Sequence, residues 1–381
     1  MKIKEFGVEQ WMNNYEDTAR FNLGETCVSP LSLHDLLKLV DVDEDIFVQK
    51  IVNKRLTYGD ILGNVELKQN IARLFQTPLE PEQIITTHGA IGANDLVLRS
   101  IVDPGDEVIV VAPTYQQVQS IPEALGATVK VLHLKPAQNY LPDIDELRQL
   151  VNPKTKLIIL NNPNNPSGSL IPQVLLQDIV EIAQEVNAYI MCDEVYRFLT
   201  QAEQYSSSIV DLYKRGIATG SMSKVFSLAG LRLGWIVTRD SQIMTDIHNH
   251  RDYNTISSGV LNEMIANVAL GHADKIIQRN RKIVLKNLVV LDNWVNDQAH
   301  ISWVKPQAGT TALLHYDFKI NSETFCDQLF RQKGVLLVPG VEFGIEHAVR
   351  IGYAFETAEL KKGLEKISEF IMENKSILCS N

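Results

Sequence analysis

Residues 221–235 read SMSKVFSLAGLRLGW, and they place one lysine, Lys224, among small and hydroxyl-bearing residues, with Arg232 eight positions further on. A lysine amine is a nucleophile only when it is deprotonated, and a partly apolar pocket with a neighbouring cation lowers its pKa. Such an amine forms a Schiff base with an aldehyde. The guanidinium of Arg232 and the hydroxyl of Ser221 offer donors suited to phosphate oxygens. The stretch therefore indicates a ligand that carries an aldehyde and a phosphate, as pyridoxal phosphate does.

The composition is that of an ordinary soluble protein. Of its residues, 45% are hydrophobic and 22% are charged. With 381 residues, the chain is long enough for two domains that share a sizeable core. A formal net charge of -10 argues against a nucleic-acid or anionic-membrane partner, because both need a basic face. The first residues lack the apolar run of a signal peptide, and no stretch reaches membrane-spanning length, so we expect a cytoplasmic protein.

The cysteines and histidines give no sign of a metal site. Cys27, Cys192, Cys326 and Cys379 lack the spacing of metal ligands, and the nine histidines form no HExxH pattern. In a chain of this length the cysteines are predicted to be free thiols, and metal catalysis is not expected.

Apolar, β-branched runs alternate with helical patterns through the middle of the chain. The runs cover residues 84–87, 107–111, 129–134, 157–160 and 188–193. This alternation predicts a parallel sheet with helices on both faces. Because such sheets bind ligands at the carboxyl ends of their strands, the residues that follow these runs are the candidates for a site.

Two of these strand ends carry suitable groups. Gly89, Ala90 and Ile91 lie between a strand and a helix, where unpaired backbone amides and the helix dipole favour an anion, so we expect them to contact a phosphate. Asp193 ends another buried run. A carboxylate beside a pyridine nitrogen keeps that nitrogen protonated, which lets the ring accept electrons from a substrate.

Several further segments follow recognisable patterns. They are the tyrosine-glycine stretch from Tyr58, the loop NNPNNPSG over residues 161–168, the DEVY sequence over residues 193–196, and Arg350 inside an apolar strand. Together with the lysine stretch, and in the same order, these segments resemble the motifs of the aspartate aminotransferase superfamily, the fold type I pyridoxal-phosphate enzymes. The resemblance covers nearly the whole chain.

The resemblance implies an α/β architecture with two domains. A large cofactor-binding domain over residues 45–282 would contain a mostly parallel, seven-stranded sheet covered by helices. Residues 1–44 and 283–381 would form a small α/β domain, with the N-terminal segment lining the substrate pocket. Residues 248–253, a polar patch, are predicted to form a surface helix.

The resemblance also implies a role for each matching position. Lys224, Asp193 and Tyr115 would be catalytic, with Lys224 as the Schiff-base lysine and Tyr115 stacked on the cofactor ring. The implied cofactor-binding set is Tyr58, Gly89, Ala90, Ile91, Tyr115, Asn165, Asp193, Tyr196, Ser221, Lys224 and Arg232.

The same resemblance implies substrate contacts and an oligomeric state. Arg350 matches the arginine that holds the substrate carboxylate as a bidentate pair, helped by Asn165 and by the backbone at Gly24. Tyr58 matches a tyrosine that reaches into the neighbouring subunit, which implies a homodimer. Asn94 stands where the family usually has a large apolar residue, and its role is left open.

The expected reaction is transfer of an amino group from an amino acid to a 2-oxo acid through pyridoxal phosphate. Two alternatives on the same fold stay open, because fold alone does not decide the reaction. One is a carbon–sulfur β-lyase. The other is a cyclase, since the N-terminal stretch is somewhat similar to that of capreomycidine synthase; in that case Glu25 would face a basic substrate side chain.

Overall fold

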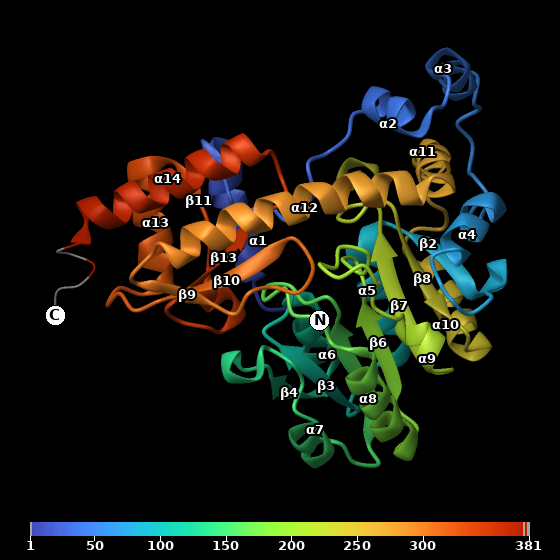
Figure 1. Cartoon of the computed structure of the whole chain (residues 1–381). Coiled ribbons are helices and arrows are strands. Elements are labelled where there is room, and N and C mark those ends of the chain that lie inside the picture. The colour runs from blue at the N-terminus through green and yellow to red at the C-terminus, as the bar shows by residue number, and fades with distance from the viewer. Residues whose placement is uncertain (1, 376–377, 379–381) are drawn as a thin grey trace.

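The computed structural model describes residues 2–375 and 378. Two α/β units lie side by side, and helix α12 (Ala273–Asn296) runs from one to the other (Figure 1). Its buried positions, among them Ile277, Val284, Leu288 and Leu291, recur three or four residues apart and form one apolar stripe. The expected domain boundary at residue 283 falls inside this continuous helix.

The larger unit contains the predicted seven-stranded sheet, with the order β2-β8-β7-β6-β5-β3-β4. Strand β8 runs antiparallel to both of its neighbours, and the other pairs are parallel. The strands are β2 (Ile84–Thr87), β3 (Glu107–Ala112), β4 (Thr128–His133), β5 (Thr155–Asn161), β6 (Tyr189–Asp193), β7 (Gly216–Ser221) and β8 (Gly234–Thr238). This confirms the predicted fold class.

Helices cover both faces of this sheet. Successive residues of β3 alternate between two hydrophobic clusters, with Val108 and Val110 on one face and Ile109 and Val111 on the other. The first face packs against α5 (Gly89–Ile101), α6 (Gln117–Leu125) and α10 (Ser241–Asp252), and α7 (Ile144–Leu150), α8 (Gln173–Glu185) and α9 (Ile209–Leu212) lie on the other side. A sheet buried on both faces explains why its strands read as continuous apolar runs.

The smaller unit is built mainly from the C-terminal part of the chain. Its four strands have the order β12-β13-β10-β9, all antiparallel, and a separate parallel pair joins β1 to β11. The elements are β1 (Phe21–Asn22), β9 (Ile301–Trp303), β10 (Thr311–Tyr316), α13 (Ser322–Lys333), β11 (Val335–Leu336), β12 (Val338–Pro339), β13 (Ala348–Gly352) and α14 (Thr357–Glu373).

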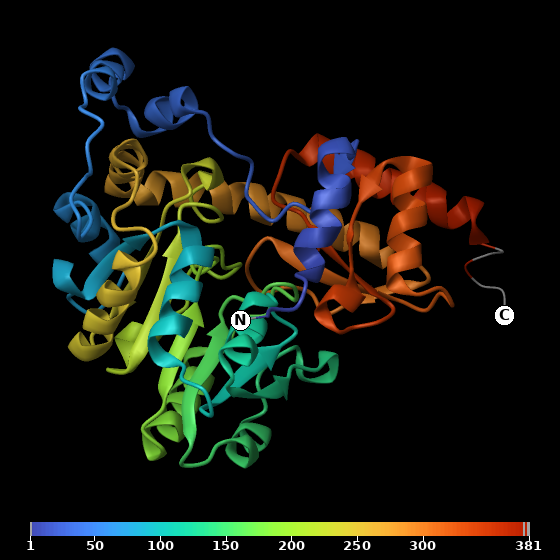
Figure 2. The ribbon, with the colours of Figure 1, turned by 180° about the vertical axis from the view of Figure 1, so that it is seen from behind.

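The N-terminal segment docks on this smaller unit, as expected. Helix α1 (Gly7–Tyr15) lies against the smaller unit (Figure 2). It buries Val8 and Trp11 on one face, and the Trp11 indole donates to the Leu337 carbonyl oxygen at 2.8 Å. Further along, the Gly352 amide donates to the Leu23 carbonyl oxygen at 2.7 Å. A Cβ atom on Gly352 would lie 1.7 Å from the Glu25 carbonyl oxygen, so only glycine permits this approach.

Four helices at the far end of the larger unit complete the fold. They are α2 (Leu33–Val40), α3 (Glu44–Val52), α4 (Val65–Ala72) and α11 (Val260–Gly271). Ser32 caps α2 by accepting from the Asp35 amide at 3.1 Å. Of the predicted surface helix over residues 248–253, all but Tyr253 belong to α10. Arg251 in it is buried, and its guanidinium donates to the carbonyl oxygens of Ile61 and Ile256.

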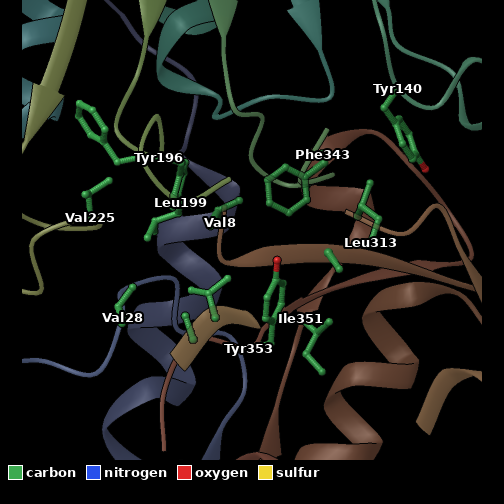
Figure 3. Packing of buried hydrophobic residues seen from close by; sticks show 14 of the residues in the cluster. Val8, Val28, Tyr140, Tyr196, Leu199, Val225, Leu313, Phe343, Ile351 and Tyr353 are labelled. Atoms are coloured by element: carbon green, nitrogen blue, oxygen red, sulfur yellow. The ribbon is translucent and has the colours of Figure 1, made fainter. Parts of the chain in front are cut away.

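The apolar core is continuous between the two units. Figure 3 shows Tyr196 of the larger unit, Val8 of α1, and Phe343 and Ile351 of the smaller unit within one hydrophobic cluster. Cys27, Cys192 and Cys326 are free thiols, and Cys379 lies outside the described residues. Among the helices that the structure describes, none is long and apolar enough to cross a membrane.

Candidate active site

A cavity of about 320 Å³ lies where the carboxyl ends of the parallel strands face the smaller unit. Eleven of the thirteen predicted site residues line it: Gly24, Ala90, Ile91, Tyr115, Asn165, Asp193, Tyr196, Ser221, Lys224, Arg232 and Arg350. They come from the N-terminal segment, from the ends of five different strands (β2, β3, β5, β6 and β7), from the segment before β8 and from β13, so only the folded chain brings them together.

Lys224 follows β7, and its Nζ donates to Thr26 Oγ1 at 2.5 Å and to Cys27 Sγ at 3.4 Å. Burial lowers the pKa of Lys224, but Cys27, Tyr196 and the Glu25 carboxylate outweigh burial and raise it above its ordinary value. The sequence led us to expect a lowered pKa, whereas the charge of Glu25 and the acceptors Thr26 and Cys27 beside the amine favour its charged form.

Asp193 ends β6 with its carboxylate buried and held from two sides. Oδ2 accepts from Asn94 Nδ2 at 2.9 Å, and Oδ1 accepts from the Val195 amide at 3.1 Å. The Thr219 hydroxyl in turn donates to Asn94 Oδ1 at 2.7 Å, which fixes the orientation of the amide. Burial raises the pKa of Asp193, and the hydrogen bonds from Asn94 and Val195 and the charge of Lys224 oppose that rise. Asn94 therefore orients the Asp193 carboxylate and stabilises its charged form.

The turn between β2 and α5 forms the anion end of the cavity. Gly89 has φ of +69°, and a Cβ atom there would lie 2.9 Å from Nη2 of Arg232. The N-cap residue of α5, His88, makes no side-chain hydrogen bond to the first turn, so the helix N-terminus has no side-chain cap. Ser221, at the end of β7, lines the same cavity. A glycine cradle, an uncapped helix N-terminus, a hydroxyl and a guanidinium together suit a phosphate.

The aromatic and amide groups line the middle of the cavity. Tyr115 follows β3, and its hydroxyl donates to Glu9 Oε1 at 2.5 Å. Burial, together with the Glu9 carboxylate, raises the pKa of Tyr115 well above its ordinary value. The Asn165 amide nitrogen of the backbone donates to Asn161 Oδ1 at 2.7 Å, which fixes the loop that carries it. Tyr196 is buried nearby and also lines the cavity.

Arg350 lies on β13 and is 3% exposed. Its Nη1 donates to Asn165 Oδ1 at 3.3 Å and its Nη2 donates to the Gly24 carbonyl oxygen at 2.9 Å, whereas Nε has no hydrogen-bond partner. No carboxylate of the described residues lies within the 4.0 Å of an ion pair with it. A buried guanidinium is costly without a counter-ion, so the cavity is prepared for an anionic ligand group.

Two predicted residues stand apart from this cavity. Gly89 is not itself a lining residue but lies between His88 and the lining residue Ala90, close to the Arg232 guanidinium. Tyr58 is 71% exposed and lines a different hollow with Asn64 and Glu263. Sequence reasoning did not single out Glu9, Glu16, Thr26 or Gln117, which also line the cavity. No spacing rule connects an N-terminal helix with a strand end more than two hundred residues later, so the sequence held little signal for them.

The residues present fit pyridoxal phosphate. A buried lysine, a glycine and arginine cradle at a helix N-terminus, and a buried carboxylate without an ion-pair partner in the described part of the chain match its aldehyde, its phosphate and its ring nitrogen. The sheet and this set of groups define a fold type I pyridoxal-phosphate enzyme.

Comparison with known proteins supports the assignment to the pyridoxal-phosphate enzymes. The model of the family described as aminotransferase class I and II matches residues 40–367. The chain belongs to this family and is a pyridoxal-phosphate-dependent transferase of the aminotransferase class. It is 30% identical to capreomycidine synthase from Streptomyces vinaceus over 319 residues, which cover 82% of this chain and 80% of that protein.

Two further relatives have similar coverage. An aspartate aminotransferase from Thermotoga maritima is 28% identical over 339 residues, which are 85% of each chain. The crystal structure of a PLP-dependent aminotransferase from Streptococcus suis 89-1591 superposes with a TM-score of 0.95 at 41% identity, covering 98% of this chain and 99% of that one.

Proposed function

We propose that this enzyme transfers the amino group of an L-amino acid to a 2-oxo acid, with the substrate held by Arg350 and the proton carried by Lys224. The observation that supports this most is Arg350. Its buried guanidinium has no carboxylate partner among the residues that the structure describes, and it lines the same cavity as Lys224, so a carboxylate bound there would bring an amino acid next to the lysine.

The cofactor would be held at three points. Lys224 would bind the aldehyde, Ser221 and Arg232 with the backbone amides of residues 89–91 would bind the phosphate, and Asp193 would face the ring nitrogen. When bound, pyridoxal phosphate supplies the aldehyde that takes up the amino group and a ring that accepts the electrons left at Cα. Tyr115 would cover one face of the ring, and Asn165 and Tyr196 would donate to its phenolic oxygen.

Lys224 then acts as the general acid and base. When it is not bound to the aldehyde, its amine would be free to take the proton from Cα of a substrate held by Arg350. Asn165 and the Gly24 carbonyl orient Arg350, which fixes the substrate carboxylate and limits the direction in which the Cα proton points.

The test is an absorbance spectrum of the purified holoenzyme before and after addition of single L-amino acids, with the products identified. We expect the cofactor band to shift and one 2-oxo acid to appear for each amino group taken up. Lys224→Ala should keep the fold and lose this conversion by at least about a thousandfold, because the proton carrier is gone. Full turnover by Lys224→Ala would refute the assignment.

A cyclase is the second candidate, because Glu25 lines the cavity and capreomycidine synthase is among the relatives. A cyclised product from a hydroxylated basic amino acid, with no 2-oxo acid released, would support the cyclase. Ammonia and pyruvate from a cysteine conjugate would instead support a carbon–sulfur β-lyase. Both outcomes leave the roles of the cofactor residues unchanged.

The assembly we propose is a cytoplasmic homodimer in which Tyr58 completes the site of the partner. Tyr58 is exposed, and so are other apolar side chains near it in the sequence: Leu56, Ile61, Leu62 and Val65. The buried Arg251 guanidinium holds this segment in place by donating to the carbonyl oxygens of Ile61 and Ile256. Such an apolar face is typical of a surface that another subunit covers. The free thiols are typical of a reducing compartment.

A further inference from the structure

Seven charged side chains line the active-site cavity, and the proposed function accounts for four of them. Asp193, Lys224, Arg232 and Arg350 have roles toward the cofactor or toward the substrate carboxylate. The remaining three are all carboxylates: Glu9, Glu16 and Glu25. An α-amino acid and its cofactor offer these carboxylates no second cation unless the substrate side chain supplies it.

The three carboxylates come from one short part of the chain. Glu9 lies in α1, Glu16 begins the short helix Glu16–Thr18, and Glu25 follows β1. Because α1 is anchored through Trp11 to the smaller unit and through the Gly7 amide to Gln116 Oε1 at 2.9 Å, the helix that carries Glu9 is fixed at the edge of the cavity.

Neighbouring groups hold each carboxylate in position. Glu9 Oε1 accepts from the Tyr115 hydroxyl, Glu16 Oε1 accepts from Asn22 Nδ2 at 3.2 Å, and Glu25 Oε1 accepts from the amides of Thr26 and Cys27, both at 2.7 Å. Over residues 2–375 and 378, no Lys, Arg or His forms an ion pair within 4.0 Å of any of the three. Lys224 is close enough to influence Glu25, whereas Glu9 and Glu16 are ordered negative charges without an ion-pair partner among the described residues.

The charges are close enough to influence one another. Burial, and next the charge of Glu25, raise the pKa of Glu16. Burial also acts to raise the pKa of Glu25, but the charge of Lys224 and the hydrogen bonds from Cys27 and Thr26 outweigh it and lower that pKa. Like charges that converge on one space repel each other, and a bound cation removes that repulsion.

Building on the proposed function, we propose that the preferred amino donor is a basic amino acid, whose guanidinium or ammonium end binds to Glu9 and Glu16 while its carboxylate binds to Arg350. Glu25, which lies nearer to Lys224, adds negative charge to the same space. A guanidinium suits this set particularly well, because its planar donors bind two carboxylates at once. An acidic side chain would meet three like charges, so aspartate should be a poor donor.

The test compares L-arginine with L-citrulline, which has nearly the same shape but no charge, in the half reaction of the holoenzyme. We expect kcat/KM to be at least about tenfold higher for arginine, and the ratio to fall by about tenfold or more in the double variant Glu9→Gln/Glu16→Gln. Glu181→Gln, an exposed position on α8, is the matched control and should leave the ratio unchanged. An unchanged ratio in the double variant, or a preference for aspartate or alanine over arginine, would overturn the inference.

Calorimetry separates this inference from the proposed reaction. Arginine and citrulline are titrated into cofactor-loaded Lys224→Ala protein, in which chemistry is blocked, before and after the two glutamine substitutions. Tighter binding of arginine that depends on Glu9 and Glu16 supports the basic substrate even if no 2-oxo acid is ever released. Equal binding of the two ligands overturns the basic substrate even if transamination of another amino acid is observed.

Discussion

At the scale of single residues, Asn94 is the position where the structure adds most to the sequence. The sequence marked it only as a polar residue where an apolar one is usual. In the structure its side chain links Thr219 to Asp193. Because the Asp193 carboxylate is buried, the hydrogen bond from Asn94 is one of the few interactions that favour its charged form.

Replacing Asn94 by alanine should therefore weaken cofactor binding. Loss of a hydrogen bond to a charged group corresponds to about 1.5–3 kcal/mol, so we expect the cofactor affinity to fall by about tenfold to a hundredfold. Equilibrium dialysis of the cofactor measures this. Thr219→Val, which removes only the group that orients Asn94, should give a smaller loss in the same direction, and a wild-type affinity in both variants would contradict the role.

The same variant has a consequence for stability against pH. A carboxyl whose pKa is raised by folding contributes stability that is complete below its unfolded pKa and is lost as pH rises through the folded value. Asn94→Ala raises the pKa of Asp193 further, so its destabilising effect on the cofactor-free protein should be larger at about pH 8 than at about pH 5. Thermal unfolding of both proteins at the two pH values measures this, and an effect that shrinks with increasing pH would speak against it.

At the scale of elements, the junction of β2 and α5 carries the anion end of the site. Its strand and its helix were both predictable from the sequence, because apolar β-branched residues precede a small-residue turn and an amphipathic pattern. The contact between Gly89 and the Arg232 side chain was not predictable, since it joins two segments that are far apart in the sequence. The positive φ of Gly89 and the nearness of Nη2 both require glycine.

Gly89→Ala should reduce cofactor affinity, because the new methyl group displaces the Arg232 guanidinium. The left-handed backbone of residue 89 adds about 1–2 kcal/mol of destabilisation when it carries a side chain. Gly92→Ala is the matched control: it lies in the same helix at negative φ, and its Cβ atom would meet only the Cβ of His88 at 3.4 Å. Cofactor titration and thermal unfolding should show the defect in the first variant alone; equal effects of the two would argue against a phosphate site here.

At the scale of the whole molecule, the sequence predicted the sheet and most of the cavity. Eleven of the thirteen predicted site residues line one cavity because each follows a strand or lies in a strong local pattern. It also predicted that the N-terminal segment lines the substrate pocket, but not that Glu9 and Glu16 would be among the lining residues. Glu9 and Glu16 lie in an ordinary helical pattern, and only the docking of α1 between the two units brings them to the substrate side.

The dimer we propose makes a prediction about mixed subunits. If Tyr58 acts in the partner's site, mixing Tyr58→Phe protein with Lys224→Ala protein creates hybrids in which one site has both Lys224 and Tyr58 intact. We expect such mixtures to regain the cofactor affinity and turnover that each parent lacks, measured after unfolding and refolding the chains together. No recovery, with hybrid dimers demonstrated by mass, would mean that Tyr58 does not act across subunits.

The docking of α1 also divides the chemistry of the cavity along the chain. Apart from Tyr58, the groups that we propose to hold the cofactor belong to residues 89–232, whereas the three carboxylates that we propose to face the substrate side chain belong to residues 9–25. A lineage that exchanges this short stretch can therefore acquire a new donor while the catalytic apparatus stays intact. Substitutions in residues 9–25 would thus change which amino acid is bound, while the residues that carry out the reaction stay the same.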